Sequence, residues 1–319
     1  MKIKTLIQDY YLSFEYNNLR AETKVQYKYF LDIFSNTSVQ KNQKLGSLVL
    51  SSLTTKMAKL SYNVWCDRGV PMANHIMSVA RVLLNYGINM EHCGTNPFSN
   101  IKKRVSNNRK VVWSKKDVIR FLDTAYSDFK TRSIGLIAHM AYEWCQRIGD
   151  MRLLEWSSID LQENKMYLLQ SKRRAEVFLP ISDELAEMLH QQQDDYGFQK
   201  YVVPRPRAYR GSYVPYSLTK LPLVARKVMD SAGLSKELRL SDLRRTGTVE
   251  MVDAGVSMGN IMSVTGHANP QSVKPYMKNT FTSANLALQT RRGLTENKTH
   301  GTSTATKQIV VRKVVLVFA

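Results

Sequence analysis

The stretch LSDLRRTGTVEMVDAGVSMGNIMSVTGHANPQSVKPYMK, residues 240–278, is the most informative part of this chain. Its apolar spacing predicts three helices, at about 242–254, 257–265 and 270–278. The side chains in it that can carry chemistry are Ser241, Arg244, Arg245, His267 and Tyr276. Guanidinium groups bind anions, an imidazole moves protons and a phenol can act as a nucleophile, so the stretch has the groups for chemistry on an anionic substrate.

Two segments further upstream add charged side chains of the same kind. Arg147 lies in CQRIGDMRLLEWSSID (145–160), and Asp150 follows it on the same helical face, where it can orient the guanidinium. Two β-type runs, MYLLQS (166–171) and EVFLPI (176–181), are joined by Lys172, Arg173, Arg174 and Ala175. They predict a hairpin with a basic tip.

These segments, in this order and at this spacing, resemble the tyrosine recombinase (phage integrase) family, from about residue 3 to about residue 285. The gaps from Arg244 to His267 and from His267 to Tyr276 match the family's layout, and the segment around Arg147 resembles its first arginine box. The resemblance implies a mainly α fold with a small antiparallel β-sheet. It also implies two domains, an all-helical core-binding domain and a mixed α+β catalytic domain.

The resemblance further implies a role for each of these residues. Tyr276 would attack a DNA phosphate and form a covalent 3′-phosphotyrosine, and Arg147 and Arg244 would bind the non-bridging oxygens. Lys172 would protonate the leaving 5′-oxygen. His267 would hydrogen-bond the phosphate or help to accept the tyrosine proton. Because the bond energy is kept in the phosphotyrosine, the implied reaction needs neither ATP nor a metal ion, and we expect no cofactor.

Ser241 departs from the family pattern, which commonly has His at this position, and Arg245 stands where another His is frequent. A serine can hydrogen-bond a phosphate but cannot act as an acid or base near neutral pH. Two roles stay open for Ser241. It can cap the helix predicted at 242–254, or it can hydrogen-bond the scissile phosphate as part of the catalytic set.

The sequence before this region predicts a helical domain at 1–100 and a basic linker at 101–112. Val25, Tyr29 and Ile33, with Phe30 and Phe34, recur at helical spacing, and a second helix at 72–86 is expected to stop at Gly87. Ser114 and Asp117 form a capping pair that opens the catalytic domain, predicted at 113–285. The candidate DNA-binding residues outside the catalytic set are Lys102, Lys103, Arg104, Arg109, Lys110, Arg173, Arg174 and Arg245.

The charge of the chain favours a nucleic-acid partner. The 319 residues hold 46 Lys and Arg against 26 Asp and Glu, a net charge of +20, and residues 1–110 hold 16 against 6. Such a protein attracts polyanions, although a generally solvating surface or an anionic membrane partner is also compatible with the charge. Three widely spaced cysteines argue against a disulfide scaffold and a zinc site. The sequence lacks an apolar run long enough to span a membrane, and we expect no membrane partner.

The C-terminal residues 286–319 are treated as a tail. SANLALQ (283–289) resembles the short helix that family members dock on a neighbouring protomer. QIVVRKVVLVFA (308–319) is a strong strand signal, which fits either an edge strand added to a sheet or a disordered, aggregation-prone end.

The predicted function is therefore site-specific recombination of DNA, for integration or excision of a phage or mobile element. The implied partners are double-stranded DNA with inverted-repeat core sites and further copies of the chain, forming a tetramer in the synaptic complex. The expected location is the bacterial host cytoplasm or nucleoid. Alternatives are a Xer- or Cre-like resolvase, a non-catalytic DNA-binding regulator on the same fold, and a basic scaffold or RNA-binding protein.

Overall fold

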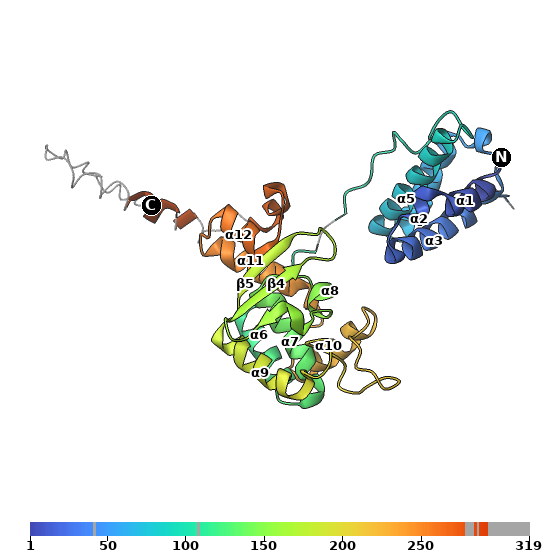
Figure 1. Cartoon of the computed structure of the whole chain (residues 1–319). Coiled ribbons are helices and arrows are strands. Elements are labelled where there is room, and N and C mark those ends of the chain that lie inside the picture. The colour runs from blue at the N-terminus through green and yellow to red at the C-terminus, as the bar shows by residue number, and fades with distance from the viewer. Residues whose placement is uncertain (41–42, 107–108, 278–283, 286, 293–319) are drawn as a thin grey trace, which may run out of the picture. The chain divides into compact units, whose positions relative to one another are not determined.

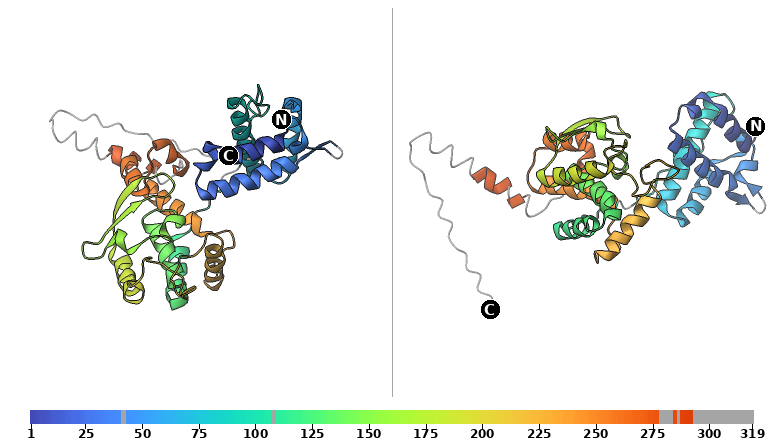
Figure 2. Two further views of the ribbon diagram at one scale, coloured as in Figure 1. Left: turned by 45° about the vertical axis from the view of Figure 1, so that its right-hand side comes forward. Right: turned by 60° about the horizontal axis from the view of Figure 1, so that its bottom comes forward.

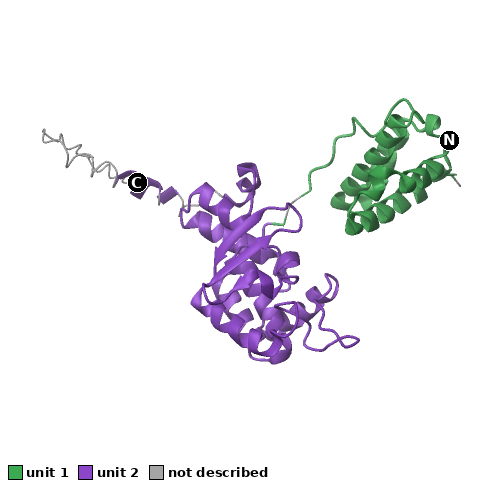
Figure 3. Cartoon of the chain, in the orientation of Figure 1, with its two compact units in different colours: residues 1–109 green, residues 110–319 purple. Residues whose placement is uncertain are grey.

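The structure of the protein is a computed structural model that describes residues 1–40, 43–106, 109–277, 284–285 and 287–292. The chain divides into two compact units, residues 1–109 and 110–319 (Figure 3). Helices predominate in both units, and the second carries a small antiparallel sheet. The predicted fold class is confirmed.

The first unit is a set of helices around one apolar core (Figure 1). Its helices are α1 (Ile3–Leu12), α2 (Phe14–Asn17), α3 (Ala21–Asn36), α4 (Thr55–Asp67) and α5 (Val70–Asn89). A two-stranded ribbon that the sequence did not predict, β1 (Ser38–Gln40) and β2 (Gln43–Lys44), separates α3 from α4. The indole of Trp65 stacks on the ring of Phe98 at 5.8 Å, which fixes the segment after α5 against α4.

Two details of this unit differ from the sequence expectation. On α3 Phe34 is buried, as is Leu31, and Phe30 and Ile33 pack partly buried against the core, whereas Val25 and Tyr29 are mostly exposed. The helix predicted to stop at Gly87 continues past it. A Cβ at Gly87 would lie 3.0 Å from a Leu6 methyl carbon, so this glycine allows close packing of α5 on α1 and is not a stop signal.

The start of the basic segment 101–112 is held against the first unit. The guanidinium of Arg81 donates to the carbonyls of Phe98, at 2.9 Å, and of Ile101. The backbone N–H of Arg104 donates to the Tyr62 hydroxyl at 2.7 Å, and Lys103 Nζ lies 2.6 Å from Ser78 Oγ. Up to Arg104 the chain therefore follows the helices.

The second unit packs most of its other helices around α7, whose residues 133–141 are all buried (Figures 1 and 2). The helices are α6 (Lys115–Tyr126), α7 (Phe129–Glu143), α8 (Ile148–Met151), α9 (Asp183–Tyr196), α10 (Lys220–Ser231), α11 (Leu243–Asp253) and α12 (Met258–Thr265). The predicted cap of α6 is present, because Ser114 Oγ accepts a hydrogen bond from the N–H of Asp117 at 3.1 Å.

The predicted hairpin is confirmed as β4 (Lys165–Leu169) and β5 (Glu176–Pro180), with Leu169 opposite Glu176. A short third strand, β3 (Ile159–Asp160), pairs with β4 and gives the antiparallel order β3-β4-β5. Helix α12 packs beside β5. Residues alternate strictly between exposed and buried along both strands, so one face of the hairpin packs on the core.

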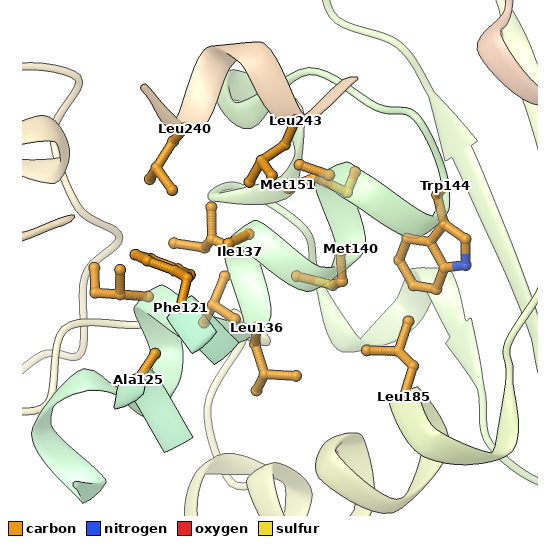
Figure 4. Packing of buried hydrophobic residues seen from close by; sticks show 14 of the residues in the cluster. Phe121, Ala125, Leu136, Ile137, Met140, Trp144, Met151, Leu185, Leu240 and Leu243 are labelled. Carbon is orange, nitrogen blue, oxygen red and sulfur yellow. The ribbon is translucent and has the colours of Figure 1, made fainter. Parts of the chain in front are cut away.

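The apolar core of the second unit includes the end of α7, which comes shortly before Arg147 in the sequence (Figure 4). Met140 and Trp144 of the α7 end are buried beside Leu185 of α9. The Trp144 indole N–H donates to the carbonyl of Pro180 at 2.9 Å, which joins the end of α7 to the end of β5. Arg147 follows this anchored point by three residues, so its backbone starts from a rigid base.

The helix predicted at 270–278 is wrong. The segment forms two 3-10 turns, η5 (Pro270–Ser272) and η6 (Lys274–Tyr276), because Pro275, inside the predicted helix, cannot donate a backbone hydrogen bond. The described part of 283–289 is helical, at residues 284–285 and 287–289. The strand predicted at 308–319 lies outside the described residues.

Among the described residues, none of the helices has the length and apolar character that a membrane crossing requires.

Candidate active site

The two arginines expected to bind phosphate lie together. Arg147 precedes α8, and Arg244 lies in the first turn of α11 with only 8% of its surface exposed. Together with Ser241 they line a cavity of about 570 Å³. Burial, and next to it the charge of Arg147, lowers the pKa of Arg244. Two close positive charges, one of them poorly solvated, are the arrangement that an anion stabilises.

One donor of Arg244 stands ready for a ligand. Its Nη2 donates to the carbonyl of Thr265 at 2.8 Å, whereas its buried Nη1 has no hydrogen-bond partner among the described residues. Leaving a buried charged donor unpaired costs free energy, which a bound oxyanion would remove. A phosphate oxygen beside Arg244 Nη1 would supply the missing acceptor.

Asp150 lies beside Arg147, as expected from its spacing. Its Oδ2 is 3.8 Å from Arg147 Nη1, and its Oδ1 accepts from the N–H of Ser171 at 3.1 Å. The side chain is almost completely buried. Asp150 therefore connects the first arginine to the beginning of the hairpin turn.

His267 is a buried, neutral imidazole. Burial, and then the charges of Arg244, Arg173 and Arg147, lower its pKa to about 4. Its Nε2 lies 3.3 Å from Arg244 Nη2, and because a guanidinium only donates, Nε2 is the acceptor. Nδ1 then carries the hydrogen and donates to Thr265 Oγ1 at 2.6 Å. The tautomer follows from its two partners.

Tyr276 lies half-buried in η6 and faces both His267 and Arg245. The centres of the tyrosine and imidazole rings are 5.9 Å apart. The Arg245 guanidinium carbon lies 4.9 Å from the centre of the tyrosine ring, and Arg245 Nη1 is 3.5 Å from the carbonyl of Pro275. Arg245, which we expected only to bind DNA, thus contacts the candidate nucleophile.

The hairpin tip presents Lys172, Arg173 and Arg174 to solvent. Arg173 Nη1 lies 3.2 Å from Ser272 Oγ, which joins the tip to the turn before Tyr276. Lys172 makes no hydrogen bond or ion pair within the part of the chain that the structure describes. Its ammonium group is therefore free to reach a ligand.

The capping role considered for Ser241 is wrong. A 3-10 turn, η4 (Leu240–Asp242), precedes α11, and the carboxylate of Asp242 accepts from the N–H of Arg239 at 3.0 Å. Ser241 is exposed and, within the described residues, its hydroxyl has no hydrogen-bond partner. Ser241 lines the cavity beside the two arginines, so a hydrogen bond from its hydroxyl to the phosphate stays a prediction.

The structure also brings in three residues that the sequence analysis missed, Gln146, Gln170 and Thr265, which are all buried. Gln170 receives a hydrogen bond from Arg147 at 2.8 Å. A signal for it exists, since the alternation of β4 places Met166, Leu168 and position 170 on the inward face. A glutamine at an inward position requires buried partners.

The remaining candidate DNA-binding residues lie at the end of the first unit and the start of the second. Lys102, Lys103, Arg104 and Lys110 are exposed, and Arg109 is half-buried. Arg104 also donates to the side-chain oxygen of Asn63 at 3.0 Å. Over the described ranges, no group of three or more His, Cys, Asp or Glu side chains is placed to hold a metal ion.

Comparison with known proteins identifies the family. Residues 112–283, more than half of the chain, match the phage integrase family. The chain belongs to this family. It is a site-specific recombinase of the tyrosine type, and the predicted family and enzyme class are confirmed. A search among curated proteins found no match.

Solved structures show the same fold as this integrase-family chain. A lambda integrase dimer bound to a COC′ core site is 18% identical, with a TM-score of 0.71 over 88% of this chain and 78% of that one. A lambda integrase tetramer bound to a Holliday junction is 17% identical, with a TM-score of 0.71, covering 88% and 78%. The Tn1549 transposon integrase with a circular-intermediate DNA is 14% identical, with a TM-score of 0.72, covering 91% and 99%.

Proposed function

We propose that this recombinase cleaves and rejoins DNA through Tyr276, at a phosphate bound by Arg147 and Arg244. The observation that carries the proposal is the unpaired Nη1 of Arg244, a buried charged donor in a site that also holds Arg147, His267 and Tyr276. These residues come from three separate parts of the sequence. A phosphate oxygen bound at this place would supply the acceptor that this donor lacks.

In the proposed reaction the phenolic oxygen of Tyr276 attacks phosphorus, and the bond from phosphorus to the 5′-oxygen breaks. The two guanidinium groups stabilise the negative charge that develops on the non-bridging oxygens. The 3′ end stays attached to the protein as a phosphotyrosine, and the reverse reaction with another 5′-hydroxyl reseals the strand. The energy of the phosphodiester is retained throughout.

Protons move at two places. His267 is neutral, and once the Nε2 lone pair exchanges its hydrogen bond from Arg244 for one from Tyr276 or the bound phosphate, Nε2 accepts the phenolic proton. Lys172, at the exposed hairpin tip, donates a proton to the leaving 5′-oxygen. The contact from Arg173 to Ser272 supports this assignment, because it holds the tip beside the segment that carries the nucleophile.

We further propose that the substrate is double-stranded DNA with inverted-repeat core sites, bound by several copies of the chain and by four in the synaptic complex. The net charge of +20 supports a DNA partner. Lambda integrase, a protein of the same fold, binds a core site as a dimer and a Holliday junction as a tetramer, which supports assembly on DNA. Integration or excision of a phage or mobile element is the biological role we assign, which places the protein in the host cytoplasm or nucleoid.

The test is a covalent-trapping assay. A binding selection from random duplexes first supplies a core site. A nicked duplex of that site then releases a short 5′-hydroxyl strand on cleavage, which prevents resealing. We expect a protein–DNA adduct that survives denaturation with the unaltered protein and none with Tyr276→Phe, although both bind the site. The exposed Tyr209→Phe is the matched control and should form the adduct. An adduct with Tyr276→Phe would overturn the assignment.

A further inference from the structure

The side chain of Gln170 is completely buried at the end of β4, and its amide is fully used. Oε1 accepts from Arg147 Nη1 at 2.8 Å. Nε2 donates to Gln146 Oε1 at 2.7 Å and to the carbonyl of Thr265 at 2.9 Å. A guanidinium has no acceptor, so the amide oxygen must face Arg147 and the amide nitrogen must face the other two partners.

The Thr265 carbonyl also binds the second arginine, accepting from Arg244 Nη2 at 2.8 Å. A continuous chain of hydrogen bonds therefore runs from Arg147 through Gln170 and Thr265 to Arg244. The hydroxyl of Thr265 extends this chain to His267, whose Nδ1 is 2.6 Å away. One buried amide thus stands between the two guanidinium groups and the imidazole.

The rest of the network holds the amide in place. Gln146 is also completely buried, and its Nε2 donates to the carbonyls of Val264, at 2.7 Å, and Trp144, at 2.8 Å. Gly266 adopts φ +67°, and a Cβ there would lie 2.4 Å from Gln170 Nε2. The backbone is pressed so closely against the amide that no side chain fits between them.

Gln170 also closes the hairpin turn through its backbone. Its N–H donates to the carbonyl of Ala175 at 2.9 Å, and its carbonyl accepts from the N–H of Arg174 at 3.0 Å. The turn between these contacts carries Lys172. The same residue therefore fixes the base of the Lys172 turn with its main chain and the two arginines with its side chain.

We propose that Gln170 is a positioning residue of the recombinase, which sets the separation and orientation of Arg147 and Arg244 for one phosphate. This rests on the proposed function, in which both arginines bind the scissile phosphate. Only an amide satisfies the network, because methionine offers no hydrogen bond and a glutamate carboxylate lacks the donors that face Gln146 and Thr265. A misplacement of about 1 Å in such a site costs about 10²-fold in rate.

The chain offers a matched control in Gln192 of α9, a second completely buried glutamine in the same unit. It has the same kind of partners, since its Oε1 accepts from Arg132 Nε at 2.8 Å and its Nε2 donates to Ser133 Oγ and the Val202 carbonyl. None of these residues belongs to the candidate site. Gln192→Met therefore reproduces the loss of a buried amide without touching the arginines.

The experiment compares single-turnover cleavage at saturating DNA for Gln170→Met, Gln192→Met and Arg147→Ala, below the unfolding temperature of each. We expect Gln170→Met to cleave about 10- to 100-fold more slowly with DNA affinity nearly unchanged, and Gln192→Met to cleave within about threefold of the unaltered protein. Gln170→Met should slow cleavage much less in the Arg147→Ala variant than in the unaltered protein, because Gln170 acts partly through Arg147. Equal effects of Gln170→Met and Gln192→Met, or full additivity with Arg147→Ala, would overturn the proposal.

Gln170→Glu gives an independent readout in pH. The cleavage rate of this variant should approach that of the unaltered protein as the pH falls. A protonated carboxyl regains one hydrogen-bond donor and no longer competes with the phosphate for Arg147. A deficit that is constant with pH would count against positioning through the arginines. If Arg147→Ala itself cleaves normally, the proposed function fails. If Arg147→Ala is slow and Gln170→Met is not, only the positioning role fails.

Discussion

The guanidinium of Arg245 lies over the ring of Tyr276 at 4.9 Å and reaches the carbonyl of Pro275, so the proposed nucleophile is contacted by a residue adjacent in sequence to Arg244. Helix α11 thus supplies one arginine to the proposed phosphate site and the next to the tyrosine. Helix α11 also packs against η6, and Arg245 adds a contact to the tyrosine ring itself.

Arg245→Gln should therefore slow cleavage by about 3- to 30-fold at saturating DNA, because a cation–π contact contributes about 0.5–2 kcal/mol. Single-turnover rates and DNA affinity, measured together, check this. The loss should persist on a substrate whose leaving oxygen is replaced by sulfur, since that leaving group needs no general acid. Arg174→Gln, at the exposed hairpin tip, is the control. If Arg245→Gln changes only affinity and its salt dependence, Arg245 is a DNA contact and not a support for Tyr276.

Arg244→Met should abolish most activity without destabilising the fold. The removed guanidinium is buried, close to Arg147 and missing one acceptor, so its loss should leave the free energy of unfolding unchanged or higher by about 1 kcal/mol. Cleavage should fall by about 10²- to 10³-fold, the usual cost of one lost charge-stabilising donor.

Thermal unfolding with and without inorganic phosphate separates these effects. Phosphate should raise the melting temperature of the unaltered protein, because it binds the folded state, and should do so much less for Arg244→Met. A large drop in melting temperature without phosphate would show that Arg244 is mainly structural.

The buried imidazole of His267 predicts a pH dependence of stability. Its pKa is lowered to about 4, against 6.5 for an unperturbed histidine. Between these pH values the unfolded state binds more protons than the folded state. The free energy of unfolding is therefore highest above about pH 6.5 and falls as the pH drops toward 4. The loss due to His267 is up to about 3 kcal/mol. Urea unfolding at several pH values should show a shallower acid slope for His267→Gln, whereas the exposed His190→Gln should keep the original slope.

The salt dependence of binding tests the basic character of residues 1–110. With about 6–10 phosphate contacts per protomer, the logarithm of the binding constant should fall with the logarithm of salt concentration with a slope of about −5 to −9. Lys102→Gln should reduce the size of the slope by about 1 without changing site preference. Lys102 is the cleaner choice for this test, since Lys103 and Arg104 also hold their segment against the first unit. A slope near zero would remove nucleic acid as the partner.

The parts of the site that the sequence predicted are those set by local pattern or by the family's spacing. The alternation in β4 and β5 specifies the hairpin and places Lys172 at its tip, and the tyrosine and both arginines follow from the resemblance. Gln170 and Thr265 were missed because their importance lies in hydrogen bonds to residues far away in sequence. A buried polar side chain shows its partners only once the chain is folded.

The errors have equally local causes. The helix predicted at 270–278 ignored the break that Pro275 makes in the backbone hydrogen bonds. The apolar spacing at 25–34 predicts a helix that α3 confirms, with Phe34 buried and Phe30 and Ile33 partly buried, but Val25 and Tyr29 are mostly exposed. Periodicity identifies the helix, whereas the burial of each residue depends on what packs against it.

Ser241 gives the sharpest case, because the structure removes one of its two candidate roles. Its hydroxyl caps no helix, so Ser241→Ala should change the free energy of unfolding by less than about 0.5 kcal/mol, the range of ordinary surface substitutions. If the hydroxyl bonds the phosphate, the same variant should cleave about 3- to 10-fold more slowly, as expected for one hydrogen bond of about 1 kcal/mol.

Ser241→His decides whether the family's usual residue can be restored. The cavity of about 570 Å³ beside Arg147 and Arg244 has room for an imidazole, and the position is exposed, so the fold should tolerate it. An imidazole there would add a second donor for the phosphate, and cleavage should hold or rise relative to the unaltered protein. Both variants are measured by single-turnover cleavage at one pH, with Ser235→Ala as the control for a serine away from the arginines. If Ser241→Ala is as inactive as Tyr276→Phe, the serine belongs to the essential machinery. Its hydroxyl would then do more than tune the rate.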